Sequence, residues 1–206
     1  EHKNFAFLNI SKNPITTLKT IVLQERGLKN LPQHTIHRMI GHCPNQYNIE
    51  PFKIYDYEKK RGKELIKFAV IRDPVSRLIS TYKLFWLDNY PHAYFNAMKQ
   101  KYNINTLDKF IQWVANYELT KPVLQQDEHI RKQLAWLKDI QYLNYIVPIE
   151  HLDDFIHNKL HIGNFNKENA TKHNIELSKE QINMIKTIYA DDYIELQKIP
   201  QQLIYS

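Results

Sequence analysis

Three short apolar runs, separated by longer amphipathic stretches, dominate the pattern of hydrophobic and polar positions along the chain. Continuous apolar runs of this length are typical of buried strands, and they occupy residues 5–10, 65–71 and 143–147. Apolar residues at helical spacing predict helices over 18–24, 75–86, 107–114 and 150–160, with a last one after Ser178. Strands that alternate with helices predict an α/β fold with a central, mostly parallel sheet flanked by helices.

Local signals indicate where the helices begin. An Asp-Pro pair at 73–74 is typical of an N-cap followed by the first helical residue, and Thr106 is an N-cap candidate. Ser178 opens a capping box with the glutamine three residues later. Asp127 is interpreted as the N-cap of a helix that runs to Leu137. The remaining stretches are expected to be loops with short helices, and they cover 30–50, 52–57 and 88–102.

The composition is that of a globular domain. The chain has 206 residues, 43% of them hydrophobic, with no repeat and no linker rich in Gly or Ser, so residues 1–206 are expected to form a single domain. No apolar run approaches the roughly 20 residues of a membrane span, and no signal peptide is expected. Cys43 is the single cysteine, which excludes an internal disulfide and suits a reducing compartment. We expect the bacterial cytoplasm, with the Golgi lumen as the alternative if an N-terminal anchor was removed.

The balance of charges favours an anionic partner. Lys and Arg number 28 against 22 acidic residues, a net charge of +6, which suits a nucleotide, an acidic glycan, a nucleic acid or a membrane surface. The basic residues are spread along the chain, so most are expected to form a solvated surface. Because no dense basic stripe and no nucleic-acid motif are present, no nucleic acid is expected as partner. A noncatalytic nucleic-acid-binding module nevertheless stays as an alternative.

Cations follow two of the expected strands where each strand ends. The strand at 65–71 leads into Arg72 and a helix that carries Ser80, and the strand at 5–10 leads into Lys12, Thr16 and Thr17. Parallel strands bring such ends to one edge of a sheet, where helix N-termini bind anions. The pattern therefore favours a ligand with two separated anionic groups. In the structural alternative, the threonines only cap a helix, Lys12 is solvated, and Arg72 pairs with a nearby carboxylate.

Glycine is too scarce for the common phosphate loops. The chain has four glycines, and neither G-x-G-x-x-G nor G-x-x-x-x-G-K-S/T is present. An anion site at this edge must therefore be built from side chains and helix starts.

Two segments resemble the nucleotide-binding motifs of the sulfotransferases. SKNPITT (11–17) is similar to their 5′-phosphosulfate loop, and IRDPVSRLIS (71–80) is similar to their 3′-phosphate motif. Their order and separation resemble the carbohydrate sulfotransferases, especially the heparan sulfate 2-O-sulfotransferase-like branch. QDEHIRKQ (126–133), VPIEHLDDF (147–155) and IYADDY (188–193) resemble later segments of the family, so the resemblance covers most of the chain. It implies a P-loop-like sulfotransferase fold and the donor 3′-phosphoadenosine 5′-phosphosulfate (PAPS).

The resemblance also implies roles for particular residues. The 5′-phosphosulfate would be held by Lys12, Asn13, Thr16 and Thr17, and the 3′-phosphate by Arg72 and Ser80. Lys12 would act in catalysis as well, because it is placed to neutralise the charge that grows on the departing phosphate oxygen. No metal is expected for this chemistry. The loop departs from the family at Pro14 and Ile15, where small residues are usual, and Pro14 has no N–H to offer.

The acceptor hydroxyl loses a proton during the transfer, so a base is required. His42 is the candidate base, because the Gly41–His42 pair resembles a glycine–histidine pair of the 2-O-sulfotransferase-like enzymes. Histidine also has a suitable ordinary pKa. His34 and His37 are alternatives, and His129 is a candidate for contact with the acceptor.

The sequence thus predicts a PAPS-dependent sulfotransferase that acts on a hydroxyl of a carbohydrate by in-line displacement. The carbohydrate is expected to be a poly- or oligosaccharide and to be anionic. The enzymatic alternative is a nucleotide-dependent, kinase-like transferase, which would bind ATP and Mg²⁺. The sequence does not indicate an oligomeric state.

Overall fold

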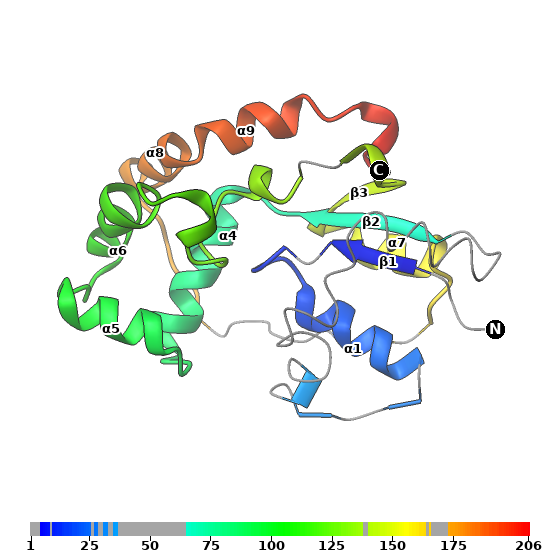
Figure 1. Cartoon of the computed structure of the whole chain (residues 1–206), viewed down its shortest axis with the longest axis horizontal. Helices are drawn as coiled ribbons and strands as arrows, with labels where there is room; N and C mark the ends of the chain where they lie inside the picture. The colour runs from blue at the N-terminus through cyan, green and yellow to red at the C-terminus, as the bar shows by residue number, and fades with distance from the viewer. Residues whose placement is uncertain are drawn as a thin grey trace.

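The computed structural model describes residues 5–8, 10–25, 27–28, 31–32, 35–36, 65–137, 140–163, 165 and 173–206 (Figure 1). The strands of this part are β1 (Phe5–Leu8), β2 (Ile66–Ile71) and β3 (Tyr145–Pro148). Its α-helices are α1 (Ile15–Glu25), α4 (Pro74–Tyr82), α5 (Ala93–Lys101), α6 (Leu107–Trp113), α7 (Leu152–Asn158), α8 (Lys179–Ile188) and α9 (Ala190–Gln197).

The three strands form one parallel sheet in the order β1–β2–β3. β2 is central, with Phe7 opposite Phe68 on one side and Val70 opposite Val147 on the other. The apolar run that predicts β2 is buried because strands and helices cover it, as is usual for a parallel sheet. The sheet confirms the predicted α/β fold with helices flanking a parallel sheet. All three strands point the same way, so their carboxyl ends share one edge.

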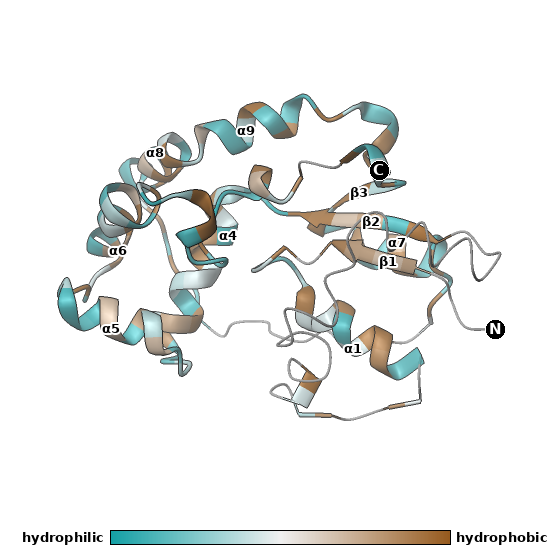
Figure 2. Cartoon of the chain, in the orientation of Figure 1, coloured by the Kyte–Doolittle hydropathy of each residue, from teal (hydrophilic) through white to brown (hydrophobic). Residues whose placement is uncertain are grey.

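Two apolar clusters divide the core. The first joins the sheet to α1 and α7 through Leu18, Phe68 and Phe155. The second is formed by the helices α4, α5, α6 and α8, and its largest members include Trp86 and Phe110. Figure 1 shows these helices beyond the end of β2, away from the sheet. In Figure 2 the strands are mostly brown, whereas α8 and α9 alternate between brown and teal, as expected for surface helices.

β2 leads directly into α4, where the Asp-Pro signal is confirmed. The Asp73 side chain accepts a hydrogen bond from the backbone N–H of Ser76 at 2.8 Å, and Pro74 is the first helical residue. The predicted helix over 75–86 is confirmed with one difference: after Tyr82 the chain widens into a π-helical turn, Lys83–Leu87. Such turns are often found at functional sites, and this one carries Phe85.

The predicted helix from Asp127 to Leu137 is wrong. The chain forms turns from Asp127 onward, and only the short 3₁₀ segment Gln133–Ala135 is helical. The reason lies in long-range contacts, because side chains from elsewhere take the backbone groups that a helix would pair internally. Arg77 donates to the carbonyls of Glu128 and Arg131, and Asp192 accepts from two backbone N–H groups of the segment.

The other local predictions can be compared with the described elements. Thr106 caps α6, and Ser178 forms the expected capping box of α8. The helix predicted over 150–160 is α7, which is shorter, and α9 was not predicted as a separate helix. Residues 52–57 and most of 30–50 lie outside the described residues. None of the helices in the described ranges has the length and apolar character of a membrane span.

Candidate functional site

The structure brings the two predicted anion motifs together at the carboxyl edge of the sheet. β1 and β2 are adjacent and parallel, so the loop after β1 lies beside the start of α4. A hydrogen bond from Arg72 Nη1 to the carbonyl oxygen of Lys12 joins the two loops at 3.3 Å. Lys12 and Arg72, which are 60 residues apart in the chain, are therefore parts of one site.

Lys12 lies in an unusual backbone conformation, with φ at 65°. A residue with a side chain rarely adopts this left-handed region, and such conformations cluster at functional sites. Burial, followed by the charges of Arg72 and Arg77, lowers the pKa of Lys12 from 10.5 to about 7, while Asp88 acts in the opposite direction. The ammonium lies 5.8 Å from the centre of the Phe85 ring. Three cationic groups thus gather in one place, which is an arrangement that an anion would stabilise.

The first turn of α1 lies next to Lys12. The helix begins at Ile15, so Thr16 and Thr17 are inside its first turn and neither precedes the helix as an N-cap. Both threonines are buried. An 11-residue helix has the positive end of its dipole at this turn, and an anion beside Lys12 would meet it there.

A cavity of about 250 Å³ lies beside Arg72, against one face of α4. Ser76, Ser80 and Lys83 contribute its other polar side chains, together with the carboxylate of Asp73. Their spacing of four and three residues places them on one helix face. Arg72 Nε donates to Ser76 Oγ at 2.8 Å. This bond holds the guanidinium against the face of α4 that lines the cavity. A guanidinium, two hydroxyls and an ammonium form a suitable set of donors for a phosphate.

The sequence predicted Arg72 and Ser80 for this cavity but missed Ser76 and Lys83. The signal was present, because 76, 80 and 83 follow the helical period after Arg72. Apolar side chains complete the lining, and they are Val75, Ile79 and Leu177.

Asn13 has partners inside the protein. Its side-chain amide donates to the carbonyl oxygen of Val70 and to Gln133 Oε1, the latter at 3.1 Å. Gln133 is fully buried and also bonds both backbone groups of Arg72, accepting from its N–H at 3.1 Å and donating to its carbonyl at 2.7 Å. The Asn13 side chain therefore fixes the shape of the loop. Gln133, which no argument from the sequence assigned a role, ties both anion loops to the segment 127–136.

Arg77 is a fully buried cation that organises the same region. Its guanidinium donates to three carbonyl oxygens, those of Ser11, Glu128 and Arg131, at 2.8 to 3.0 Å. These bonds connect α4 to the loop after β1 and to the segment that carries His129. Arg77 thus holds the loop after β1 and the segment that carries His129 against α4.

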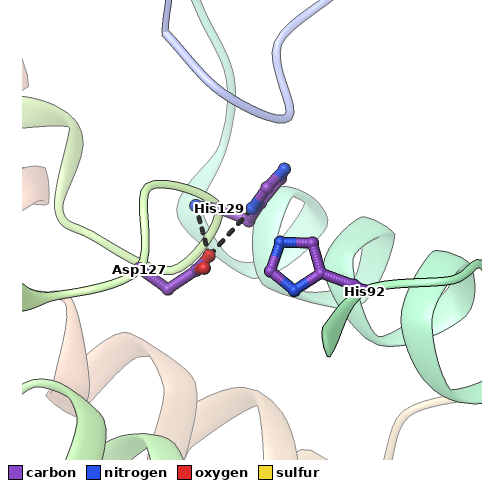
Figure 3. A group of neighbouring side chains, drawn as sticks. All are labelled: His92, Asp127 and His129. Atoms are coloured by element: carbon purple, nitrogen blue, oxygen red, sulfur yellow. Dashed lines mark hydrogen bonds and ion pairs between the residues drawn. The ribbon is translucent and has the colours of Figure 1, made fainter. Parts of the chain in front are cut away.

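Two histidines and an aspartate lie close together next to Phe85 (Figure 3). His129 Nδ1 is 2.8 Å from Asp127 Oδ1, and each residue of the trio, which also includes His92, offers one ligand atom within 4.8 Å of the others. In the described part of the chain this is the group whose atoms come near enough to share a cation. Asp127 is committed to His129, however, through the ring nitrogen and through the backbone N–H at 2.9 Å.

The candidate base from the sequence, His42, lies outside the described residues, as do the alternatives His34 and His37. His129 is described, and both His129 and Lys12 contact the ring of Phe85.

One of three comparisons with known proteins identifies a family for the chain. A family model described as the Sulfotransferase family matches residues 1–195. No curated protein and no solved structure matched the chain.

Proposed function

Because the chain belongs to the sulfotransferase family, we propose that it transfers the sulfuryl group of PAPS to a hydroxyl of a carbohydrate. The observation that carries the proposal is the joining of two cation-bearing loops at one sheet edge, through Arg72 and the Lys12 carbonyl. A donor with a phosphate at each end of its ribose matches two anion sites that share an edge. The family supports sulfuryl transfer in general; the donor and the acceptor class are our proposals.

In the proposed complex the 5′-phosphosulfate lies against Lys12 and the first turn of α1, with Thr16 and Thr17 as hydroxyl donors. The 3′-phosphate lies in the cavity along α4, bound by Arg72 and Ser80. Lys83, which lines the same cavity, would supply a second cation there. Asn13 would act on the donor by shaping the loop.

Lys12 would make the main electrostatic contribution to the transfer. The sulfuryl group moves in line between two oxygens, and negative charge grows on the departing 5′-phosphate oxygen. An ammonium beside that oxygen stabilises the transition state more than the bound donor. The bound anion would also raise the pKa of Lys12 from about 7, so that the ammonium is fully charged when it is needed.

The proton of the acceptor hydroxyl is proposed to pass to a histidine, and the resemblance puts forward His42. If His42 is this histidine, His42→Ala will bind the nucleotide unchanged and lose transfer. Near-normal turnover of this variant would reject His42 as the base.

The acceptor is proposed to be an anionic poly- or oligosaccharide, as in the heparan sulfate 2-O-sulfotransferase-like branch. The net charge of +6 supports an acidic partner. The chain is proposed to act as a single domain without a metal, in the cytoplasm of a bacterium.

Nucleotide selectivity tests the proposed donor against a kinase-like function. Thermal denaturation is followed with adenosine 3′,5′-bisphosphate, the product form of the donor, and with ATP and Mg²⁺. We expect the bisphosphate to raise the melting temperature clearly more than ATP does. Lys12→Ala should mainly lower turnover and Arg72→Ala mainly nucleotide affinity. A preference for ATP with Mg²⁺ would contradict the proposed donor.

The acceptor class is tested by transfer of labelled sulfate from PAPS onto a panel of glycans, with chemically desulfated heparin and neutral dextran as the extremes of charge. Transfer to the acidic glycan is expected. Transfer to dextran alone would contradict an anionic acceptor.

A further inference from the structure

We propose that His129, held by Asp127, accepts the proton of the acceptor hydroxyl during sulfuryl transfer. This inference rests on the proposed function and assigns to a described pair of residues the role that the sequence suggested for His42.

The pair has the geometry of a histidine oriented by a carboxylate. Asp127 Oδ1 lies 2.8 Å from the ring nitrogen Nδ1 and 2.9 Å from the backbone N–H of His129. Burial works to raise the pKa of Asp127, but the hydrogen bonds and charge of His129 outweigh it and hold this pKa below its ordinary value. When Asp127 accepts the Nδ1–H hydrogen, Nε2 is the ring nitrogen that can take up a proton.

The position of His129 suits a reacting hydroxyl. Its ring meets Phe85 edge-on at 4.9 Å between centroids, and Lys12 Nζ lies 5.8 Å from the same Phe85 ring. The His129 side chain is 19% exposed, and none of the described residues hydrogen-bonds its Nε2. A hydroxyl bound near the Phe85 ring, which both Lys12 and His129 contact, would therefore find Nε2 without a competing partner among the described residues.

The backbone around His129 is fixed by α4. Thr81 Oγ1 donates to the His129 carbonyl at 3.0 Å, and Arg77 donates to the carbonyls of Glu128 and Arg131 on either side. Both side chains are buried. The segment 127–136 is thus held in a non-helical conformation that keeps His129 next to Asp127. A catalytic group requires such a fixed orientation.

A metal ion is the competing use of the same cluster. For a metal to use Asp127 Oδ1 together with His129 Nδ1, it would have to replace the hydrogen bond between them. If that bond is kept, Asp127 can offer only Oδ2, and its carboxylate would have to bind the metal and hold His129 at the same time. His92 Nδ1 also lies at the N-cap of α5, 3.4 Å from the backbone N–H of Phe95. The contacts therefore favour proton transfer over metal binding.

The proposed step conserves atoms and electrons. A lone pair of the acceptor hydroxyl oxygen forms a bond to the sulfur of PAPS. The bond between sulfur and the 5′-phosphate oxygen breaks, and its electron pair stays on adenosine 3′,5′-bisphosphate. The hydroxyl proton passes to His129 Nε2, the resulting imidazolium is stabilised by Asp127, and the proton later leaves to solvent.

The test compares His129→Ala, Asp127→Asn and His42→Ala with wild type, and uses His157→Ala, an exposed residue of α7, as the matched control. Release of adenosine 3′,5′-bisphosphate from PAPS is measured with desulfated heparin and with water as acceptors, and binding of the bisphosphate is measured by calorimetry. His129→Ala should lower turnover by about 10²–10⁴-fold with its nucleotide affinity within about twofold of wild type. Added imidazole should restore part of this turnover.

Asp127 acts through His129, so Asp127→Asn should lie between wild type and His129→Ala in turnover, with little change in the KM for PAPS and no rescue by imidazole. Wild-type turnover in His129→Ala, with loss only in His42→Ala, would overturn the inference and leave the proposed function standing. Activity that EDTA abolishes and Zn²⁺ restores would make the cluster a metal site instead. A wild-type protein that does not bind the bisphosphate would contradict the proposed function itself.

Discussion

Lys12 combines a left-handed backbone conformation with a half-buried ammonium near Arg72 and Arg77. In the absence of an anion these features cost stability, since a charge loses its hydration and meets like charges. A bound phosphosulfate would offset the lost hydration of the ammonium and the repulsion between the like charges. At the scale of the single residue, the chain therefore gives up folding free energy to prepare a binding site, as is common at functional sites.

Replacement of Lys12 by methionine tests this cost. Lys12→Met keeps the aliphatic length and removes the charge, so we expect lost transfer activity together with a gain of about 1 kcal/mol in the free energy of unfolding. The folded pKa of about 7 lies below the ordinary value of 10.5. Between these values the unfolded chain binds more protons, so this group makes wild type more stable as pH rises.

The gain in the free energy of unfolding of Lys12→Met over wild type should therefore be largest near pH 6 and should decrease from pH 7 to pH 10. Urea unfolding across this range measures it. A variant less stable than wild type at pH 6 would contradict a destabilising Lys12 ammonium.

Proton uptake on nucleotide binding is the second consequence for Lys12. At pH 8 a group of pKa about 7 is mostly neutral, and a bound 5′-phosphate would restore its charge. Calorimetric titration with adenosine 3′,5′-bisphosphate in buffers of different ionisation enthalpy should report uptake of about one proton at pH 8. Lys12→Met is the control and should take up fewer protons. Equal uptake by both proteins would remove Lys12 from the 5′-phosphate site.

At the scale of the element, the segment 127–136 gets its shape from its surroundings. Arg77 and Thr81 of α4 bind its carbonyl groups, and Asp192 of α9 accepts from the backbone N–H groups of Gln133 and Leu134, both at 2.9 Å. Tyr189 adds a hydrogen bond to the Ile130 carbonyl at 2.7 Å. Loss of one partner would leave buried backbone groups unsatisfied, which is expensive.

Asp192→Asn tests how much α9 contributes. The substitution keeps the volume but removes the charge that accepts two backbone hydrogen bonds, so we expect a loss of about 2–3 kcal/mol in the free energy of unfolding. Turnover should fall as well, because Gln133 and His129 belong to the same segment. Asp191→Asn is the matched control: Asp191 is exposed and pairs with Lys132 at the surface, so its unfolding midpoint should match wild type. Equal effects of the two variants would contradict the role of Asp192.

Elements with local signals could be predicted from the sequence, and elements fixed by distant partners could not. α4 and α8 form where their capping residues predict them, because a cap acts within one turn. The segment after Asp127 has the same kind of signal, yet Arg77 and Asp192, 50 and 65 residues away along the chain, take the backbone groups that a helix would use. The helical preference of that segment is weaker than these bonds.

At the scale of the whole molecule, the site lies where the sheet meets the helical cluster. Lys12 and Arg72 follow β1 and β2 and lie at the same edge of the sheet. From β2 the chain continues through α4 into the apolar cluster of α4, α5, α6 and α8. The last helices return to this junction: Tyr193 donates to Asp73 at 2.7 Å, at the N-cap of α4. The segment 127–136 and α9 thus contribute, together with α4, to holding the site.

The cations at the strand ends could be predicted because each sits within a few residues of its strand. Lys83 could have been found from the period of α4, which continues the pattern of Arg72, Ser76 and Ser80. Gln133 and the pairing of Asp127 with His129 depend on how the segment 127–136 folds, so neither follows from spacing along the chain.

The central claim is that Arg72 binds the 3′-phosphate of the donor, and nucleotide affinities test it most directly. Calorimetry compares adenosine 3′,5′-bisphosphate with adenosine 5′-monophosphate for wild type, Arg72→Ala and Lys83→Ala, with Lys109→Ala on α6 as control. Hydrogen bonds to a charged phosphate should make the bisphosphate bind wild type and the control about 10–100-fold more tightly than the monophosphate. In Arg72→Ala most of that difference should vanish, with the monophosphate affinity nearly unchanged. An Arg72→Ala protein that still distinguishes the two nucleotides as wild type does would contradict the account.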